Sequence, residues 1–577
     1  MIQLSNVLGK YRSFFFVLLM VLILIGFGFR IFKPASDPPQ WQYIYITDEG
    51  HYSYNALNRL RYGDWALEEA PYALVTPLFT ASQFLVASLL KGLPDIVRCR
   101  SISIISGILA SLLLAFFFEG KWIRVIAVLL GSFSFLGIVY SRLGITEMML
   151  ALFLQLTVLS ALHAFRKKNA LFSFTAGLLA TGCFMIKLTG AFIIPVILLA
   201  PFFCGIPYLK LKSYWKGLIT GLIAGGTIWL IFIGIPYWEE WRYMVKAVTS
   251  FGSQSISWNL QGLFKSFLKL LLSPALQTMP LLWPLAISWC LFSFLPRVKN
   301  KENSFLDILL FLWLVFGVGV LGIAMYQPAR WQLIILPPVI VIGLKFLASN
   351  PRLFVMIISF VFIATLSSSY SIFISHRFLK ITGPFDPTYG IFSHIVPACG
   401  AILIFFIVYF ALKKATGHRW QAIICSVITL ELIIQCLFHF AVTVPSFSRV
   451  SQWTTISFDM KELKAKKSVI SGKIVENLAL YSDIPVLPIF YFLENNYDSS
   501  IANFYLRQKR LPTHFILPGF ERKTWRIKAP RFMNSLQEEK KYFLHIGGIG
   551  FQEFYLYRIK SFAWLGKERV IEKRDFQ

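Results

Sequence analysis

Two adjacent carboxylates, Asp48 and Glu49, follow the first long apolar run of the chain. A loop that carries them against a bilayer would be short of water, because most of the surrounding sequence is apolar. A poorly hydrated carboxylate is a stronger base and can take a proton from an incoming hydroxyl or amine. The alternative is a solvated acidic loop that only follows membrane topology.

Three further charged residues, Glu147, Lys187 and Arg330, stand at the ends of apolar runs. An acid at the start of a helix also complements the helix dipole, and a lysine at a span end often extends toward the membrane surface. Together with Asp48 and Glu49, however, the two cations would form a site for an anionic lipid headgroup beside a base. The candidate catalytic residues are therefore Asp48, Glu49 and Glu147, and the candidate phosphate ligands are Lys187 and Arg330.

Ring-bearing residues next to these charges, His51, Tyr52 and Trp331, are candidates for substrate contacts. His51 is either a ligand or hydrogen-bond partner, or a surface histidine. The sequence has no glycine-rich phosphate loop and no HExxH or GxSxG motif. We therefore expect no nucleotide, no required metal and no other cofactor, although paired carboxylates could bind a divalent ion.

The composition is that of a polytopic membrane protein. Of 577 residues, 56% are hydrophobic and only 15% are charged. The formal charge of +28 comes from basic residues in short clusters between apolar runs, a pattern typical of cytoplasmic loops at anionic lipid rather than of nucleic-acid binding. Lys10 and Arg12 precede the first run without a cleavage site after it, which predicts an uncleaved first span.

A membrane-spanning helix needs about 20 apolar residues. The predicted spans are 13–32, 101–118, 122–140, 146–165, 170–187, 188–207, 217–236, 276–296, 305–325, 331–348, 352–372, 391–411 and 421–441. The apolar segment 77–93 is short and begins with proline. If it crossed the membrane, every later basic cluster would face the side opposite to the first, so we predict an interfacial or re-entrant helix there.

This gives about 13 crossings, with the N-terminus inside and the C-terminus outside. The loops 33–100 and 236–273 then face outward. Asp48, Glu49, Glu147, Lys187 and Arg330 share that outer face.

The composition changes after residue 445. Short runs at 469–472, 485–489, 514–517 and 554–558 predict strands, and 476–481 and 500–509 predict helices. Alternating strands and helices indicate a small α/β domain of roughly 130 residues. The predicted domains are a membrane domain, 1–445, and an extracytoplasmic α/β domain, 446–577.

The segment from Asp48 to Ala56, followed by Gly63-Asp64-Trp65, resembles the first outer loop of C-type (GT-C) glycosyltransferases. It is most similar to the group of aminoarabinose lipid A transferases, lipopolysaccharide galacturonosyltransferases and protein O-mannosyltransferases. The resemblance continues over most of the membrane half. It runs through Pro77, Val97-Arg98, the stretch from Tyr140 to Glu147, Lys187-Leu188-Thr189-Gly190, and Arg330-Trp331 before Leu336-Pro337.

The resemblance implies the GT-C fold, about 13 spans, an outward active site and an exported C-terminal domain. Four features depart from the pattern, one of which is that the aminoarabinose transferases have a Tyr near Trp331. Glu147 stands where the family usually has Asp, and Thr76 and His51 stand where the aminoarabinose transferases have Lys and Arg. These differences concern the identity of the substrate rather than the type of reaction.

The sequence thus predicts an inverting glycosyltransferase of a bacterial inner membrane. It would move a sugar from a polyprenyl-phosphate donor to lipid A or lipopolysaccharide, a glycan or a protein on the outer face. Asp48 would deprotonate the acceptor, Glu49 and Glu147 would orient it or stabilise charge at the anomeric carbon, and Lys187 and Arg330 would hold the phosphate. The alternative is a lipid or solute transporter, for which internal repeats and charges at mid-membrane would be typical.

Overall fold

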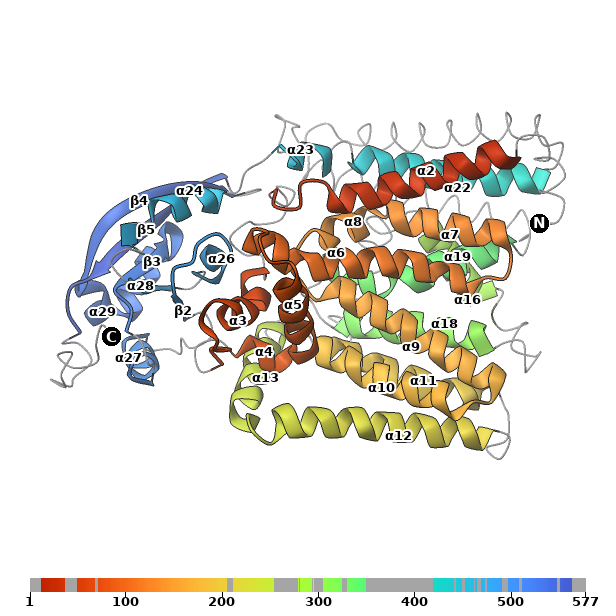
Figure 1. Cartoon of the computed structure of the whole chain (residues 1–577), viewed down its shortest axis with the longest axis horizontal. Coiled ribbons are helices and arrows are strands. Elements are labelled where there is room, and N and C mark those ends of the chain that lie inside the picture. The colour runs from red at the N-terminus through yellow and green to blue at the C-terminus, as the bar shows by residue number, and fades with distance from the viewer. Residues whose placement is uncertain are drawn as a thin grey trace. The chain divides into compact units, whose positions relative to one another are not determined.

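The computed structural model describes residues 12–36, 49–67, 71–204, 211–253, 279, 281–292, 294, 305–323, 329–348, 419–439, 443–448, 452–460, 462–463, 468–472, 475–489, 497–507, 511–546 and 550–562. The chain divides into two compact units, which are described separately (Figure 1). The first comprises Met1–Pro34 and Ser103–Pro445, and the second comprises Ala35–Ile102 and Ser446–Gln577.

The described part of the first unit is a bundle of helices, in which α2 lies beside α7 and α10 lies between α9 and α12 (Figure 1). Its elements are α2 (Arg12–Ile31), the end of α6 (Asp95–Leu113), η1 (Leu114–Phe117), α7 (Lys121–Phe133), α8 (Phe135–Ser141), α9 (Glu147–Lys167), α10 (Ala170–Ile186), η2 (Leu188–Phe192), α11 (Ile193–Phe203), α12 (Lys212–Trp229), η4 (Leu230–Gly234), α13 (Trp238–Ser253), α16 (Leu282–Phe292), α18 (Phe305–Ile323), η5 (Ala329–Ile334), α19 (Leu336–Ala348), α22 (Arg419–Phe438) and α23 (Val444–Ser446).

Every predicted span within the described ranges contains a helix. Four helical segments there are long and apolar enough to cross a membrane, and a fifth would be the bent pair α7–α8. Shorter apolar helices, such as α10 and α19, make up the rest. The predicted spans 352–372 and 391–411 lie outside the described residues, so the total of about 13 stays a prediction.

Helices α10 and α12 pack with their backbones in contact because α12 presents glycines at every fourth position, Gly217, Gly221 and Gly225. A Cβ atom on Gly221 would lie only 2.1 Å from the carbonyl oxygen of Phe174 on α10. Small residues at this spacing are the usual means by which membrane helices approach closely. The sequence pattern of α12 therefore fixes the α10 helix beside it.

The span 121–141 is broken at Ser134, where α7 and α8 bend by 55°. Such a break frees backbone groups that a membrane interior cannot hydrate, so other residues must bind them. Arg30 on α2 donates to the carbonyl oxygens of Gly131 (3.0 Å) and Ser132 (2.5 Å). The Ser134 side chain caps α8 by accepting from the Gly137 amide at 3.2 Å.

Helix α22 supplies the remaining partners of the break from a polar stripe, Glu431, Gln435 and His439, spaced four residues apart. His439 Nε2 donates to the Phe133 carbonyl oxygen at 3.0 Å, and Gln435 Oε1 accepts from the Phe135 amide at 2.8 Å. Glu431 in turn accepts from Gln435 Nε2 and from the Leu281 amide before α16, each at 2.8 Å. The stripe therefore binds backbone groups at the α7–α8 break and just before α16.

The second unit contains a five-stranded mixed sheet of order β2-β1-β3-β5-β4. The strands are β1 (Ile470–Gly472), β2 (Val486–Pro488), β3 (His514–Pro518), β4 (Leu536–Ile546) and β5 (Gly550–Ile559). Strand β1 pairs in parallel with β2 and β3, while β5 is antiparallel to β3 and β4. Alternate side chains fill two cores, since Ile516 joins the cluster on one face and Phe515 and Leu517 join that on the other.

Helices α24 (Gln452–Asp459), α26 (Val475–Ala479), α27 (Tyr497–Arg507), α28 (Arg522–Lys528) and α29 (Pro530–Asn534) accompany the sheet. All four predicted strands and both predicted helices are present in this part of the chain. The sequence analysis missed β4, α24, α28 and α29. Whether this domain is exported stays a prediction.

The segment 35–102 differs from its expected place as a loop of the membrane domain, because it groups with residues 446–577. It forms α3 (Glu49–Tyr62), α4 (Tyr72–Val75), α5 (Pro77–Leu89) and the start of α6. Helix α5 is the predicted short apolar helix. Its 13 residues extend about 20 Å, less than the ~30 Å of a bilayer core.

The predicted topology is testable with cysteines at exposed lysines. Lys91 and Lys523 should both be labelled by an impermeant thiol reagent after mutation to cysteine, whereas Lys167→Cys should be labelled only in lysed cells. Ser53 is unsuitable as a reporter because it is fully buried. Labelling of each variant is measured in intact cells or spheroplasts, and the labelling of the unmodified chain is subtracted. Labelling of Lys167→Cys alone would overturn the predicted orientation.

Candidate active site

A buried ion-pair cluster lies at the start of α9 in the first unit. Glu147, the first residue of this helix, is 0% exposed. Its Oε1 atom lies 2.6 Å from Lys187 Nζ and 3.2 Å from Arg330 Nε. The structure therefore brings together three of the predicted site residues, from positions far apart in the sequence.

Local backbone features place the two cations. Lys187 follows the last residue of α10 in an extended conformation and links it to η2. Arg330 lies in η5, just before α19. Lys187 also lies 5.4 Å from the ring centroid of Trp331, a favourable cation–π distance. Lys187 thus bonds inside the protein rather than extending to lipid headgroups.

The turn that leads to Glu147 is fixed by Arg142. This arginine donates to the carbonyl oxygens of Phe29, Phe32 and Lys33 at 2.9, 2.6 and 2.9 Å. These are carbonyls at and just beyond the C-terminal end of α2, which a cation also stabilises through the helix dipole. Arg142 therefore anchors the turn to α2 and sets where α9 begins.

The two cations of the cluster are suited to an anion. Lys187 and Arg330 both pair with the Glu147 carboxylate, which holds them side by side. The Glu147 side chain is 1% exposed, whereas those of Lys187 and Arg330 are 12% and 13% exposed. The carboxylate is therefore enclosed while both cations keep an open side, and such a site can accept a phosphate.

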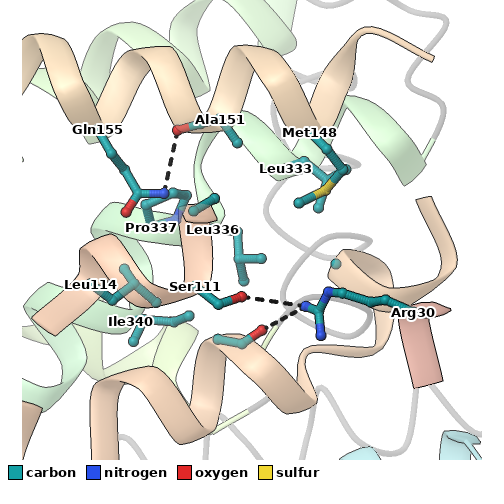
Figure 2. A pocket seen from close by; sticks show the side chains of 13 residues that line it. Arg30, Ser111, Leu114, Met148, Ala151, Gln155, Leu333, Leu336, Pro337 and Ile340 are labelled. Atoms are coloured by element: carbon teal, nitrogen blue, oxygen red, sulfur yellow. Dashed lines mark hydrogen bonds between the residues drawn. The ribbon is translucent and has the colours of Figure 1, made fainter. Parts of the chain in front are cut away.

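A small pocket with mainly apolar walls adjoins the same elements (Figure 2). Met148 follows Glu147 on α9, Leu333 belongs to η5 with Arg330, and Pro337 follows on α19. Three polar residues also line it. Arg30 donates to Ser111 Oγ at 3.4 Å, and Gln155 donates to the Ala151 carbonyl oxygen at 3.3 Å. Sequence analysis missed Arg30, although an arginine within an apolar run is a recognisable signal.

Glu49 has a different place from the one expected. It is 2% exposed, and its two carboxylate oxygens accept from Arg100 Nε and Nη2 at 2.7 and 2.9 Å. Arg100 Nη1 also donates to the Ser36 carbonyl oxygen at 2.7 Å. With both oxygens engaged, Glu49 anchors the first turn of α3. Its expected contact with the acceptor stays a prediction.

His51 and Tyr52 also pack inside the second unit, so the expectation of a surface histidine is wrong. The His51 ring stacks on Tyr72 at a centroid distance of 5.2 Å, and His51 Nδ1 lies 2.8 Å from Glu476 Oε1. Tyr52 makes edge-on contacts with Tyr72 and Phe79. These contacts hold α3 in place, and the role of His51 and Tyr52 in substrate binding stays a prediction.

Asp48 lies outside the described residues, and its place in the site stays a prediction. Within the part of the chain that the structure describes, no group of three His, Cys, Asp or Glu side chains could hold a metal. That search does not include Asp48. The expectation that no metal is required is therefore untested.

Comparison with known proteins identifies the fold. No protein-family model and no curated protein sequence matches the chain. Among solved structures, ArnT from Cupriavidus metallidurans bound to undecaprenyl phosphate matches with a TM-score of 0.54 and 13% identity, over 97% of this chain and 99% of that one. The apo state of ArnT matches with a TM-score of 0.52 and 14% identity, over 97% and 100%. The chain has the GT-C fold.

The GT-C fold confirms the family resemblance, and it agrees with an integral membrane protein. The structural match with ArnT covers nearly the whole chain. At these identities the likeness concerns the fold. The chemistry depends on the residues described above.

Proposed function

We propose that this protein is a membrane glycosyltransferase that uses a polyprenyl-phosphate-linked sugar as donor. The observation that carries the proposal is the cluster of Lys187 and Arg330 on a single buried carboxylate, Glu147. Two cations held at one position can bind a lipid phosphate. The fold supports the assignment, because ArnT in the same fold has been solved with undecaprenyl phosphate.

The reaction we propose is a single displacement at the anomeric carbon. Asp48 takes the proton from the acceptor hydroxyl or amine, and the freed electron pair forms the new glycosidic bond. The bond between the anomeric carbon and the phosphate oxygen breaks at the same time, and the phosphate leaves with its electron pair. Attack from the side opposite the leaving group inverts the anomeric carbon.

Lys187 and Arg330 stabilise the charge that develops on the departing phosphate, so no general acid is needed. Glu147 holds these two cations in place and limits their mutual repulsion. In this proposal Glu147 therefore acts on the sugar donor, through the two phosphate ligands, and not on the acceptor. Acceptors on the outer face of a bacterial inner membrane, such as lipid A, a surface glycan or a protein, belong to the same proposal.

A transporter would also need charged residues within membrane helices. Arg30 and Glu431 are such residues, but their polar contacts go to backbone groups of α2, α7 and Leu281 and to Ser111 and Gln435. The two roles are separated by mass spectrometry of lipid A, surface glycans and envelope proteins from cells with and without this chain. A sugar-sized mass present only with the chain supports transfer and names the acceptor, whereas unchanged masses contradict it.

The two cations should control donor binding. Replacing Lys187 or Arg330 by alanine should weaken the binding of the polyprenyl-phosphate donor by about 1.5–3 kcal/mol, the usual value for a charged hydrogen bond. In either variant Glu147 still forms an ion pair with the remaining cation, so we expect the protein to stay folded. Donor affinity is measured on purified protein in detergent.

Lys345→Ala is the matched control, because Lys345 is ion-paired with Asp307 in the same unit. It should bind the donor as the unmodified chain does. Normal donor affinity in both Lys187→Ala and Arg330→Ala would show that the cluster has only a structural role.

A further inference from the structure

Helix α28 (Arg522–Lys528) is a firmly anchored surface element of the second unit. Its one buried side chain, Trp525, is 1% exposed and packs against the rings of Phe515 and Phe532. Ala529 and Phe532, both fully buried, hold the chain that follows in the same apolar cluster. The surface that the rest of the helix presents is therefore held in place by the core of the sheet.

The outer face of α28 and of the start of α29 is basic. From Gly519 to Arg531 the sequence has five basic residues and one acid. Arg522 is paired with Glu538 of β4 at 2.8 Å. The other four side chains are exposed, and none forms an ion pair with any residue in the described part of the chain: Lys523, Arg526, Lys528 and Arg531. These four charges are open to a partner outside the chain.

The acids that border this face are engaged elsewhere. Glu521 accepts from Trp525 Nε1 at 3.1 Å. Asp498 accepts from the backbone amides of Arg531 and Phe532 at 3.1 and 2.9 Å. These carboxylates reduce the positive potential of the face, but they leave the four exposed cations without an ion pair.

A large apolar side chain stands among the cations. Ile527 lies between Arg526 and Lys528 in the sequence and is 70% exposed, and Phe520, just before the helix, is 52% exposed. A single exposed isoleucine is ordinary in a folded protein. An exposed apolar residue surrounded by lysine and arginine on a short helix is instead the pattern of a segment that lies on a membrane surface.

We propose that α28 and the start of α29 dock on anionic lipid headgroups of the membrane that the chain spans. Lipid phosphates would pair with the four exposed cations, and Ile527 would enter the boundary between headgroups and acyl chains. A lipid surface offers anions and apolar groups together, whereas an acidic glycan offers only the anions. Because the chain is itself a membrane protein, such a surface is present at high effective concentration.

Docking is measured with an environment-sensitive fluorophore on Thr524→Cys, an exposed position of α28, in the full chain reconstituted in nanodiscs. The signal of the labelled unmodified chain is subtracted. Nanodiscs of equal parts phosphatidylglycerol and phosphatidylcholine should shift the emission to shorter wavelength, and phosphatidylcholine alone should not. Raising the salt from about 0.1 M to about 1 M should reverse the shift, because the screening length falls from about 10 Å to about 3 Å.

Substitutions in this reporter chain test the two features separately. Arg526→Gln should lower the ratio of docked to undocked protein about fivefold, the effect of one basic residue at an anionic surface. Arg526→Lys keeps the charge and should dock normally. Ile527→Ser should weaken docking because it removes the apolar contact, whereas Ile527→Leu should preserve it.

Lys540→Gln is the matched control for the charge. It removes one exposed cation from the other face of the sheet, where Lys540 lies opposite Leu556. It should dock as the reporter chain does. Hydrogen exchange of β4 and β5 should be the same in all variants, since every substituted side chain is exposed.

Equal emission in the two kinds of nanodisc would overturn the proposal and leave this face to an acidic protein or glycan. Equal losses in Arg526→Gln and Lys540→Gln would also overturn it, because docking would then follow the total charge of the unit rather than α28. None of these outcomes depends on whether the chain transfers a sugar.

Discussion

Asp48→Asn should lower the rate of sugar transfer by about 100-fold or more while donor binding survives. Asparagine keeps the shape of the side chain and removes the oxygen charge that accepts the proton. The donor should bind normally, because Lys187 and Arg330 are unchanged. The rate is measured with purified protein and a polyprenyl-phosphate sugar, beside a binding measurement with the same donor.

Asp64→Asn is the control for this substitution. Asp64 is an exposed aspartate of the same segment, and its carboxylate accepts the Ala66 amide at 3.3 Å, a bond that asparagine can also accept. Near-normal transfer by a well-folded Asp48→Asn protein would exclude Asp48 as the base. A transporter that used this segment only as a gate should keep partial flux in the same variant.

Glu147→Gln should destabilise the protein by about 3–5 kcal/mol, the usual cost of leaving a buried charge without its partner. Two cations, Lys187 and Arg330, would face each other without the carboxylate that joins them. Added polyprenyl phosphate should restore part of the lost stability, because an anion that binds only the folded state stabilises it. Thermal unfolding in detergent, with and without the lipid, measures both effects.

Glu119→Gln is the control, since the Glu119 side chain is 91% exposed and its contact with Arg166 is long, at 4.0 Å. Exposed ion pairs contribute about 1 kcal/mol or less to stability. This variant should therefore unfold at the same temperature as the unmodified chain. The lipid should stabilise Glu147→Gln more than it stabilises Glu119→Gln. Equal stabilisation would mean that the phosphate does not bind at the Glu147 cluster.

Much of the first unit was predictable because membrane helices leave a simple signal. Runs such as 305–325 contain almost no charge, and the described helix Phe305–Ile323 falls within that run. The Glu147, Lys187 and Arg330 cluster was also predictable in part. The sidedness of the loops places these residues at the same membrane face, although it does not show that they touch.

The pairs in the second unit could not be predicted. Glu49 and Arg100 are 51 residues apart, and nothing in either sequence segment indicates that one binds the other. The partner of His51 is Glu476, in the other half of the chain. A charged residue alone shows neither its burial nor its partner, so Glu49 and His51 looked like exposed site residues.

Strand β4 was missed for a different reason. It contains the run Glu538-Glu539-Lys540-Lys541, and strong charge lowers the apparent strand propensity. In the structure β4 is an edge strand whose alternate residues Tyr542 and Leu544 are buried, while its charged residues face outward. Charged edges of this kind protect a sheet from pairing with other chains.

The break between α7 and α8 constrains the order in which the membrane domain can assemble. Phe135 and its partner Gln435 are 300 residues apart, so at about 5–20 residues per second the ribosome makes the second roughly 15–60 s after the first. Until then the Phe133 carbonyl and the Phe135 amide lack the partners that they have in the folded protein, and a straight helix over residues 121–141 would supply others. We therefore expect the 55° bend to form after α22 has entered the membrane.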